Sequence, residues 1–262
     1  MLIRWFIRRY DVDLAEVAEQ NLDAYTNFNS FFIRALRPDT RPVNRTPGVI
    51  CSPADCTVSQ LGHIKSTGIL QAKGRDFSVT ELVGGDAVRA ALFENGDFAT
   101  LYLSPKDYHR VHMPYAGRLI ESVYVPGRLF SVAAHTTRTI PKLFARNERL
   151  VTIFETEVGP MAVILVGAIF VACIETVWGG TATPPHGKQI RVQRYPSNGN
   201  DVIQLDTGDE LGRFNMGSTV VLLFGPERIA WHASLSEESP LQMGRPIGNC
   251  IRQGDSGWNW PR

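Results

Sequence analysis

The stretch that decides the fold reads Asn215-Met216-Gly217-Ser218-Thr219-Val220-Val221-Leu222-Leu223-Phe224. Its second half is rich in Val and Leu and ends at Gly225-Pro226, which is typical of a buried strand. Gly217 and Ser218 are therefore expected at the mouth of this strand, where a loop enters the core. Gly217 has no Cβ, so a nucleophile can approach its carbonyl closely. Ser218 supplies a hydroxyl that needs a base to take its proton, and without such a base Gly-Ser-Thr before a strand is only a turn.

The composition is that of an ordinary globular protein. The chain has 262 residues, of which 44% are hydrophobic, and a formal net charge of +1. It is long enough to bury a full core and has no basic excess that would indicate nucleic acid as a partner. No apolar run is long enough to span a membrane. The cysteines show no CxxC spacing, so we expect free thiols and no metal site; they are Cys51, Cys56, Cys173 and Cys250.

The N-terminus has the pattern of an amphipathic helix. Over 1–10 the apolar residues recur at helical spacing, and the arginines lie largely off that face. Such a helix suits the interface of a membrane, but it is equally suited to pack on a core of its own. Helix-forming residues continue over 11–21 and 25–36, and prolines then predict a loop over 37–48. We therefore expect an N-terminal helical segment, 1–40.

From residue 49 the pattern changes to short runs of β-forming residues separated by Gly, Pro or Asn. These runs cover 57–61, 99–103, 119–125, 150–154, 161–171, 190–192, 202–205 and 219–224. One helix is expected over 79–91. The density of strands predicts the α+β class, with a β-rich antiparallel core, short helices and the N-terminal helical extension. We expect 41–262 to form one domain.

A second informative stretch reads Ser104-Pro105-Lys106-Asp107-Tyr108-His109-Arg110-Val111-His112-Met113-Pro114. Ser104 can cap a helix, Pro105 suits its first position and Asp107 completes a variant of the capping box, so the stretch predicts a single helical turn. On that turn His109 and His112 would share one face and form a platform for acid–base chemistry. The alternatives are a pair of surface histidines or half of a metal site, although HxxH alone lacks the other ligands that zinc needs.

Asp55 follows Ser52-Pro53-Ala54 and stands just before the expected strand 57–61. An Asp in this position is most often a turn residue. Together with a His and a Ser it could instead orient the imidazole and stabilise its cation, as in a catalytic triad.

Further short motifs are spread along nearly the whole chain. They are Phe28-Asn29, Phe31-Phe32, Ser59-Gln60-Leu61-Gly62, Gln71-Ala72-Lys73-Gly74, Tyr124-Val125-Pro126-Gly127, Leu143-Phe144-Ala145-Arg146-Asn147-Glu148-Arg149, Gly159-Pro160-Met161-Ala162, Glu175-Thr176-Val177-Trp178 and Gly212-Arg213-Phe214. In these motifs and in the stretches quoted above, the sequence resembles the bacterial phosphatidylserine decarboxylases of the pyruvoyl-dependent type. The number and order of the motifs make this resemblance specific.

The resemblance implies a proenzyme that cuts its own chain between Gly217 and Ser218. In such a proenzyme Ser218 is the scissile residue and is paired with His112 and Asp55. His112 takes the hydroxyl proton of Ser218, whose oxygen attacks the Gly217 carbonyl and forms an ester. Loss of the Ser218 α-proton then expels the Gly217 carboxylate and leaves dehydroalanine, which tautomerises and is hydrolysed to a pyruvoyl group and ammonia.

The pyruvoyl group made from Ser218 is the covalent cofactor that the resemblance implies. Its ketone forms a Schiff base with the amine of phosphatidylserine and accepts electrons as CO₂ leaves, which gives phosphatidylethanolamine in phospholipid biosynthesis. His109 is the candidate for contact with the substrate carboxylate and for the protonation that follows the loss of CO₂. The resemblance also implies that the two fragments, 1–217 and 218–262, stay together in a homodimer of cleaved protomers.

The expected location follows from the substrate, which lies in a membrane. We expect peripheral association with the cytoplasmic side of the cell membrane. The segment 1–40 would make this contact, and 41–262 would be the pyruvoyl-dependent decarboxylase domain.

Two positions depart from the family pattern. Cys56 stands where Gly usually follows the Pro-Ala-Asp motif, and its Cβ would strain the backbone that aims Asp55 if this position needed a positive φ. Ala133 stands where Asn is usual, so a polar contact on the substrate side is missing. These departures leave open a lipid-binding relative without turnover. A serine hydrolase that uses Asp55, His112 and Ser218 is a third alternative, but the chain has no GxSxG elbow and Ser218 precedes a strand.

Overall fold

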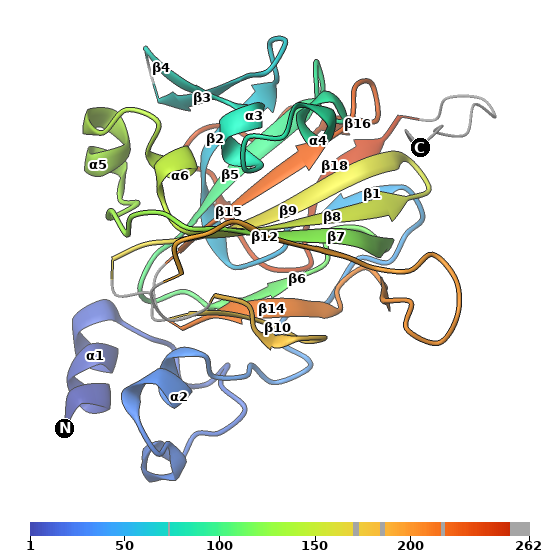
Figure 1. Cartoon of the computed structure of the whole chain (residues 1–262). Coiled ribbons are helices and arrows are strands. Elements are labelled where there is room, and N and C mark those ends of the chain that lie inside the picture. Colours follow the sequence, from blue (N-terminus) through green and yellow to red (C-terminus); the bar gives the residue numbers. More distant parts are fainter. Residues whose placement is uncertain (73, 170–172, 184–186, 216–217, 252–262) are drawn as a thin grey trace.

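A central antiparallel sheet organises the protein (Figure 1). The computed structural model describes residues 1–72, 74–169, 173–183, 187–215 and 218–251. The strands of the central sheet are β2 (Cys56–His63), β5 (Asp97–Leu103), β7 (Gly117–Val125), β8 (Arg149–Thr156), β9 (Gly159–Gly167), β12 (Arg191–Arg194), β13 (Gln204–Leu205), β15 (Ser218–Phe224) and β17 (Pro240–Leu241). Their order is β12-β7-β8-β9-β15-β5-β2-β17, and β13 also pairs with β7.

β15 lies inside this sheet, between β9 and β5, and both pairings are antiparallel. Its apolar residues are fully buried: Val220 and Leu222 face one hydrophobic core, and Val221 and Leu223 face the other. A strand covered on both faces needs such an unbroken apolar run, since each of these side chains removed from water contributes about 1.5–3 kcal/mol. The prediction of a buried strand after Gly217 is confirmed.

Two smaller sheets cover one face of the central sheet. Their strands are β1 (Val49–Cys51), β6 (Arg110–His112), β10 (Ile174–Thr176), β11 (Gly180–Thr181), β14 (Glu210–Phe214), β16 (Ile229–Trp231) and β18 (Pro246–Cys250), in the orders β11-β10-β14-β6 and β1-β18-β16. Leu211 and Phe214 from the first sheet and Ile247 from the second share a core with Leu222. This layer positions the site, because β6 carries His112 and β14 leads toward β15.

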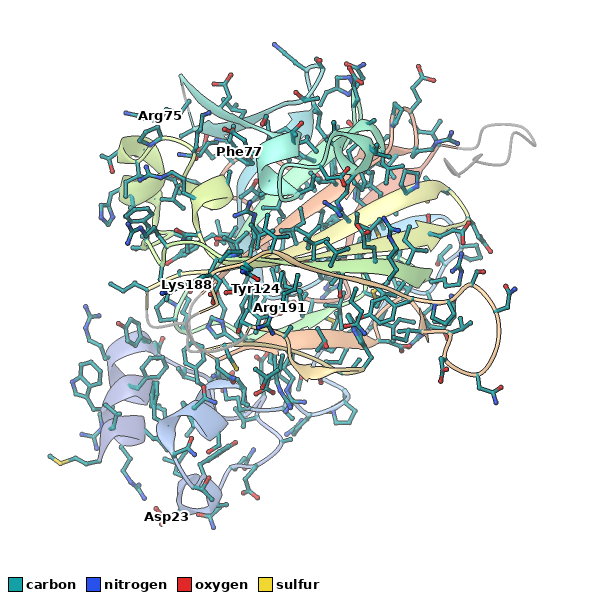
Figure 2. The ribbon with its side chains drawn as sticks, in the orientation of Figure 1. Asp23, Arg75, Phe77, Tyr124, Lys188 and Arg191 are labelled. Atoms are coloured by element: carbon teal, nitrogen blue, oxygen red, sulfur yellow. The ribbon has the colours of Figure 1, made fainter. Side chains whose placement is uncertain are left out.

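A hairpin and short helices cover the opposite face. They are β3 (Gly68–Ala72), β4 (Arg75–Ser78), α3 (Val79–Leu82), α4 (Ala87–Ala91), α5 (Ala134–Thr139) and α6 (Leu143–Arg146). Phe77 of the hairpin points toward the central sheet (Figure 2). Its ring centre is 5.9 Å from that of Phe144 of α6, and both residues share a core with Leu223. The single helix predicted over 79–91 is wrong, because Gly84 and Gly85 adopt φ +91° and +87° and so separate α3 from α4.

The N-terminal segment contains α1 (Leu2–Tyr10), the 3₁₀ turn η1 (Leu22–Ala24) and α2 (Phe28–Phe32). The helix predicted over 11–21 does not form. Side chains compete there for the backbone, since the carboxylate of Asp13 accepts from the N–H of Ala15 and that of Glu19 from the N–H of Asn21. Within 25–36, helix is confined to α2. The α+β class, with its β-rich antiparallel core and N-terminal helix, is nevertheless confirmed.

α1 has one packed edge and one exposed edge. Phe6 is buried against the aromatic rings of α2, with the ring centre of Phe28 at 5.0 Å. Leu2 and Trp5 are 55% and 56% exposed, and the arginines of α1 are exposed beside them. Both interpretations of this helix thus have a structural basis. Among the described residues, no helix has the length and apolar character that crossing a membrane requires.

Candidate active site

Ser218 is the first residue of β15, and strands on both sides fix its backbone. It pairs with Leu103, the last residue of β5, and with Gly167, the last residue of β9. Gly167 is itself held by Asn147, whose Nδ2 donates to the Gly167 carbonyl at 2.8 Å. Gly217 is outside the described residues, so the predicted scissile bond is located only through Ser218. The start of β15 therefore lies directly beside the end of β5.

The chain that follows β5 forms a turn and then a strand, so the helical turn predicted over 104–113 is wrong. The N–H of Ser104 donates to Asp107 Oδ2 at 2.7 Å, and the N–H of Asp107 donates to the Ser104 carbonyl at 3.0 Å. One of the two capping-box contacts thus forms, from the Ser104 N–H to the Asp107 side chain, but the chain then extends as β6 and pairs with β14. His109 and His112 do not share a helix face, because residues three apart in extended chain point to opposite sides.

His109 is fully buried, and its ring is stacked on Phe32 with ring centres 4.0 Å apart. Within the described residues, neither of its ring nitrogens has a hydrogen-bond partner. Burial lowers the pKa of His109 to about 3, and the nearby charge of Arg34 acts in the same direction. The carbonyls of Ser104 and Pro105 oppose this shift, but neither makes a hydrogen bond of normal geometry with the ring. The imidazole is therefore neutral, and within the described residues both of its nitrogens keep unused hydrogen-bonding capacity.

His112 is half-buried in β6 and is held at both ring nitrogens. Its Nδ1 is 2.9 Å from the carbonyl oxygen of Gly208, and its Nε2 is 3.0 Å from the hydroxyl oxygen of Tyr108. Burial lowers the pKa of His112 below its usual value, so the ring is neutral near pH 7. A neutral imidazole is the form that can take a proton from a hydroxyl.

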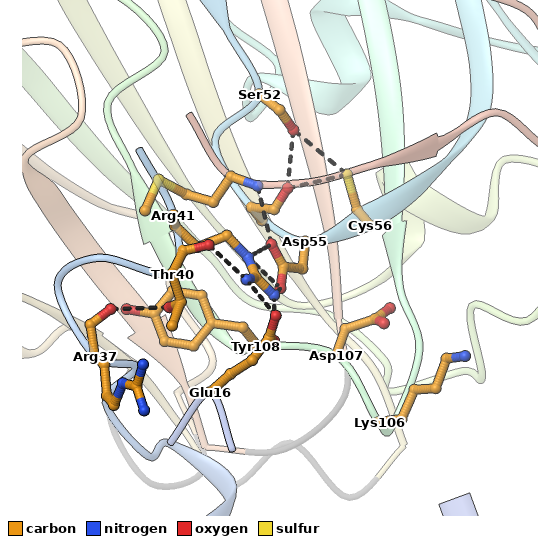
Figure 3. A network of polar contacts seen from close by, with 12 residues as sticks. Glu16, Arg37, Thr40, Arg41, Ser52, Asp55, Cys56, Lys106, Asp107 and Tyr108 are labelled. Carbon is orange, nitrogen blue, oxygen red and sulfur yellow. Dashed lines mark hydrogen bonds and ion pairs between the residues drawn. The ribbon is translucent and has the colours of Figure 1, made fainter. Parts of the chain in front are cut away.

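Asp55 is buried just before β2, where Arg41 binds it (Figure 3). Arg41 donates from Nε to Oδ1 at 2.9 Å and from Nη2 to Oδ2 at 2.6 Å, and the N–H of Met243 donates to Oδ1 at 2.9 Å. Arg41 also binds Glu16 at 2.7 Å, and hydrogen bonds to the two carboxylates raise the pKa of Arg41. Within the part of the chain that the structure describes, no hydrogen bond joins Asp55 to His112.

Backbone hydrogen bonds nevertheless bring the predicted site residues into one region. The N–H of His112 donates to the carbonyl of Pro53 at 2.8 Å, two residues before Asp55. The N–H of Phe214 donates to the carbonyl of His109 at 3.1 Å, and β14 ends there on its way to β15. β6 and β14 therefore connect the two histidines with the segment of Asp55 and with the chain that leads to Ser218.

Comparison with known proteins agrees with the resemblance. Residues 28–249 match the family model described as phosphatidylserine decarboxylase. The chain belongs to the phosphatidylserine decarboxylase family. It is 55% identical over 249 residues to the phosphatidylserine decarboxylase proenzyme of Ectopseudomonas mendocina strain ymp, with 95% of this chain and 87% of that protein covered. The proenzymes of Pseudomonas fluorescens strain SBW25 and Pseudomonas putida strain GB-1 are 55% and 56% identical over 243 and 248 residues, covering 93% and 95% of this chain and 85% and 86% of those proteins.

The two departures from the pattern of phosphatidylserine decarboxylases have different consequences. Cys56 begins β2 and is not among the residues with a positive φ, so its Cβ causes no backbone strain of that kind beside Asp55. Its thiol lies 3.8 Å from Ser52 Oγ, and burial raises the pKa of the thiol, which makes it unreactive. Ala133 precedes α5 and offers no side chain that could cap this helix.

The N-terminal segment of this decarboxylase-family chain also reaches the site. Asn29 Nδ2 donates to Asn215 Oδ1 at 3.0 Å, and Asn215 Nδ2 donates to Glu175 Oε1 at 3.0 Å. Asn215 stands three residues before the predicted scissile residue. In the same segment, Phe32 stacks on His109 and the carboxylate of Glu16 binds Arg41. The segment therefore contacts three separate parts of the site.

Sequence analysis missed several residues that hold the site together. They are Glu16, Arg41, Tyr108 and Gly208. Only Tyr108 lies inside one of the motifs of the sequence, the stretch 104–114 that also holds the two histidines. The others carry no periodic pattern or spacing, because their role comes from contacts between distant parts of the chain.

Proposed function

We propose that this chain is a self-processing decarboxylase that converts phosphatidylserine to phosphatidylethanolamine and CO₂. One observation carries the proposal: the start of β15, with Ser218, lies beside the end of β5, from which the chain turns into the segment with His109 and His112. Self-cleavage needs a serine at a fixed backbone position and a neutral imidazole to act as base. Decarboxylation can use a second, buried imidazole. The family relationship indicates the reaction and the proenzyme character of the chain.

In maturation, His112 is the proposed base for Ser218. Its Nε2 receives the hydroxyl proton, since Nδ1 already donates to a carbonyl. The oxygen of Ser218 then bonds to the carbonyl carbon of Gly217, and the peptide C–N bond breaks as His112 passes the proton to the leaving nitrogen of Ser218. Asp55 acts by its charge, which favours the imidazolium that forms on His112, and not by a direct hydrogen bond.

The proposed reaction uses a pyruvoyl group derived from Ser218. When formed, this group supplies a ketone that binds the substrate amine and withdraws electrons from the carbon that loses CO₂. His109 is the proposed contact for the substrate carboxylate, since both its nitrogens are buried and unpartnered within the described residues. A carboxylate beside this ring favours its charged form, so the pKa of His109 would rise on substrate binding and the ring could then return a proton.

We propose that the protein acts at the cytoplasmic face of the cell membrane, through the segment 1–40. The exposed edge of α1, with Leu2 and Trp5 beside arginines, supports this proposal. A homodimer of cleaved protomers is proposed from the family resemblance alone. Light scattering of the purified protein tests that assembly.

Intact mass spectrometry tests maturation. The fragment 218–262 should be lighter by one ammonia than its hydrolytic counterpart, and the protein should release CO₂ from phosphatidylserine in detergent micelles. The control is Ser218→Ala, which should remain a single chain because it has no hydroxyl to attack. A fragment with a sequenceable N-terminal serine would show ordinary hydrolysis and contradict the pyruvoyl proposal. An intact wild-type chain that binds vesicles would point to a lipid-binding relative.

A further inference from the structure

The hydroxyl of Tyr108 is directed at the proposed base. Tyr108 is 6% exposed, and its hydroxyl oxygen lies 3.0 Å from Nε2 of His112. The two ring centres are 5.6 Å apart, so the tyrosine also packs beside the imidazole. Within the described residues, this hydroxyl has no second hydrogen-bond partner. The contact with His112 is therefore the one that accounts for a tyrosine at this position.

Gly208 holds the other side of the same ring. Its carbonyl oxygen is 2.9 Å from Nδ1 of His112, and because a carbonyl can only accept, Nδ1 must carry a hydrogen. The N–H of Gly208 donates to the Met113 carbonyl at 2.9 Å. Gly208 has φ +88°, and a Cβ at this position would lie 2.6 Å from a methyl carbon of Val43. A glycine is thus needed to direct this carbonyl at the ring.

The protonation of the ring follows from these two contacts. A neutral imidazole carries one N–H, so a hydrogen on Nδ1 leaves the lone pair on Nε2. The hydroxyl of Tyr108 must then be the donor in its bond with Nε2. Burial raises the pKa of Tyr108, so the hydroxyl keeps its proton. The nitrogen that accepts the proton in the proposed cleavage is therefore held by a tyrosine.

We propose that Tyr108 is a positioning residue for self-cleavage, whose hydroxyl holds His112 in the Nδ1–H tautomer with Nε2 as the acceptor. The hydrogen bond from Tyr108 is released when Nε2 takes up the proton of Ser218. This inference rests on the proposed function, because it concerns the base of the cleavage step. Tyr108 acts through His112, and we propose no contact between Tyr108 and the scissile bond.

The same hydrogen bond affects the pH range of cleavage. A donor to the lone pair of Nε2 favours the neutral ring, so its loss makes His112 easier to protonate from solvent. The other charged groups around the ring form pairs that the loss of a hydroxyl leaves intact; they are Arg110 with Glu210 at 2.8 Å, and Arg41 with Asp55 at 2.6 Å. A protonated His112 cannot act as a base. Cleavage without the hydroxyl should therefore begin to fail at a higher pH.

Nitrogen NMR tests the tautomer directly. Histidines are labelled in the uncleaved Ser218→Ala protein, and the signals of His112 are assigned by adding His112→Gln. We expect a protonated Nδ1 and an unprotonated Nε2 that accepts a hydrogen bond. A ring protonated at Nε2 would overturn the inference, whatever the activity of the enzyme.

The rate of cleavage tests the role. Tyr108→Phe keeps the ring and removes only the hydroxyl, and Tyr115→Phe is the matched control, because Tyr115 is also buried and its hydroxyl bonds to Glu157. Proenzymes from cell-free synthesis are transferred to a series of pH values, and the appearance of 218–262 is followed over time. Tyr108→Phe should show the acid limb of cleavage at higher pH than the wild type, because the neutral ring loses the donor that favours it. The control should behave as the wild type.

The outcomes separate the inference from the proposed function. If Tyr108→Phe and the wild type share one rate and one pH profile, the inference is wrong and the proposed function stands. If the wild type does not cleave, the proposed function itself fails. Thermal unfolding of the uncleaved variants identifies the remaining case: a lower melting temperature with an unchanged acid limb would mean that Tyr108 only packs, which also overturns the inference.

Discussion

The guanidinium of Arg41 binds both carboxylate oxygens of Asp55, through Nε at 2.9 Å and through Nη2 at 2.6 Å. Both side chains are nearly inaccessible to solvent, and Arg41 binds a further carboxylate, Glu16, from the N-terminal segment. The proposed site therefore depends on an arginine that no motif marks. Removing one partner of such a buried pair leaves an uncompensated charge, which costs about 3–5 kcal/mol.

The first prediction concerns this pair. Arg41→Gln should lower the free energy of unfolding by about 3–5 kcal/mol and slow self-cleavage, because Asp55 loses its main partner. Arg41→Lys should fall between this variant and the wild type, since it keeps the charge but not the two-point contact. Urea unfolding in the Ser218→Ala background measures the stability. Arg37→Gln is the control, because Arg37 pairs with exposed Asp39, and equal stability of the two Gln variants would contradict the prediction.

The second prediction assigns different tasks to the two histidines. His112→Ala should slow self-cleavage at least about 100-fold, because the hydroxyl of Ser218 loses its base. His109→Ala should still cleave but lose most decarboxylation, since its buried nitrogens face no partner within the described residues before substrate arrives. Asp55→Ala should also slow self-cleavage, but less than His112→Ala does. A denaturing gel and CO₂ release distinguish the steps, and His63→Ala, at an exposed position, is the control. Reversed behaviour of the two variants would show that the roles are exchanged.

The third prediction concerns stability and pH. Burial lowers the pKa of His109 to about 3 in the folded protein, from an ordinary value of 6.5. Between these values the unfolded chain binds a proton that the folded chain does not, so stability is lost as the pH falls below about 6.5. The loss is about 1.4 kcal/mol per pH unit, or about 2 kcal/mol between pH 6.5 and 5. The lowered pKa of His112 acts in the same direction.

His109→Phe tests this assignment, because it fills the stacked site with a ring that cannot be protonated. Unfolding by urea at several pH values, in the Ser218→Ala background, should show a flatter dependence on pH for this variant than for His63→Phe. An unchanged slope would mean that His109 is not the group responsible.

Sequence was a good guide to the parts of the fold that depend on local pattern. The unbroken apolar run over 220–224 predicts a buried strand, and the structure buries it between two cores. The spacing over 1–10 likewise predicts α1 almost to its ends. In both cases the periodicity of the apolar residues and their burial are two aspects of the same geometry.

Sequence failed where distant contacts outweigh local signals. Ser104 and Asp107 make one of the two contacts of a capping box, yet the residues that follow pair with β14 as a strand. The contacts Arg41–Asp55 and Gly208–His112 join residues 14 and 96 positions apart in the chain, and no spacing rule could match them. The candidate residues of the site were predicted individually, but not the contacts that hold them.

The fourth prediction concerns the membrane. Leu2→Ser with Trp5→Ser should weaken binding to anionic vesicles at least about tenfold, because both exposed side chains can enter the interface, and should leave stability almost unchanged. Val88→Ser is the control, since Val88 is 69% exposed on α4, an element of the central domain. Sedimentation with vesicles measures binding. Equal binding by the double variant and the wild type would mean that α1 only packs on its own core.

The last prediction concerns the start of α5, where Ala133 has the extended backbone of an N-cap residue, with φ −62° and ψ 153°, but no side chain to cap the helix. Ala133→Asn places an acceptor where the first N–H groups of the helix lie, so it should stabilise the protein by about 1 kcal/mol and raise the melting temperature by about 2–4 °C. Ala134→Asn is the control, because a residue already inside the helix cannot cap it and should gain nothing. Both are measured by thermal unfolding in the Ser218→Ala background, so that cleavage does not contribute. If Ala133→Asn instead raises decarboxylation of the cleaved enzyme without raising the melting temperature, the asparagine usual at this position serves the substrate and not the helix.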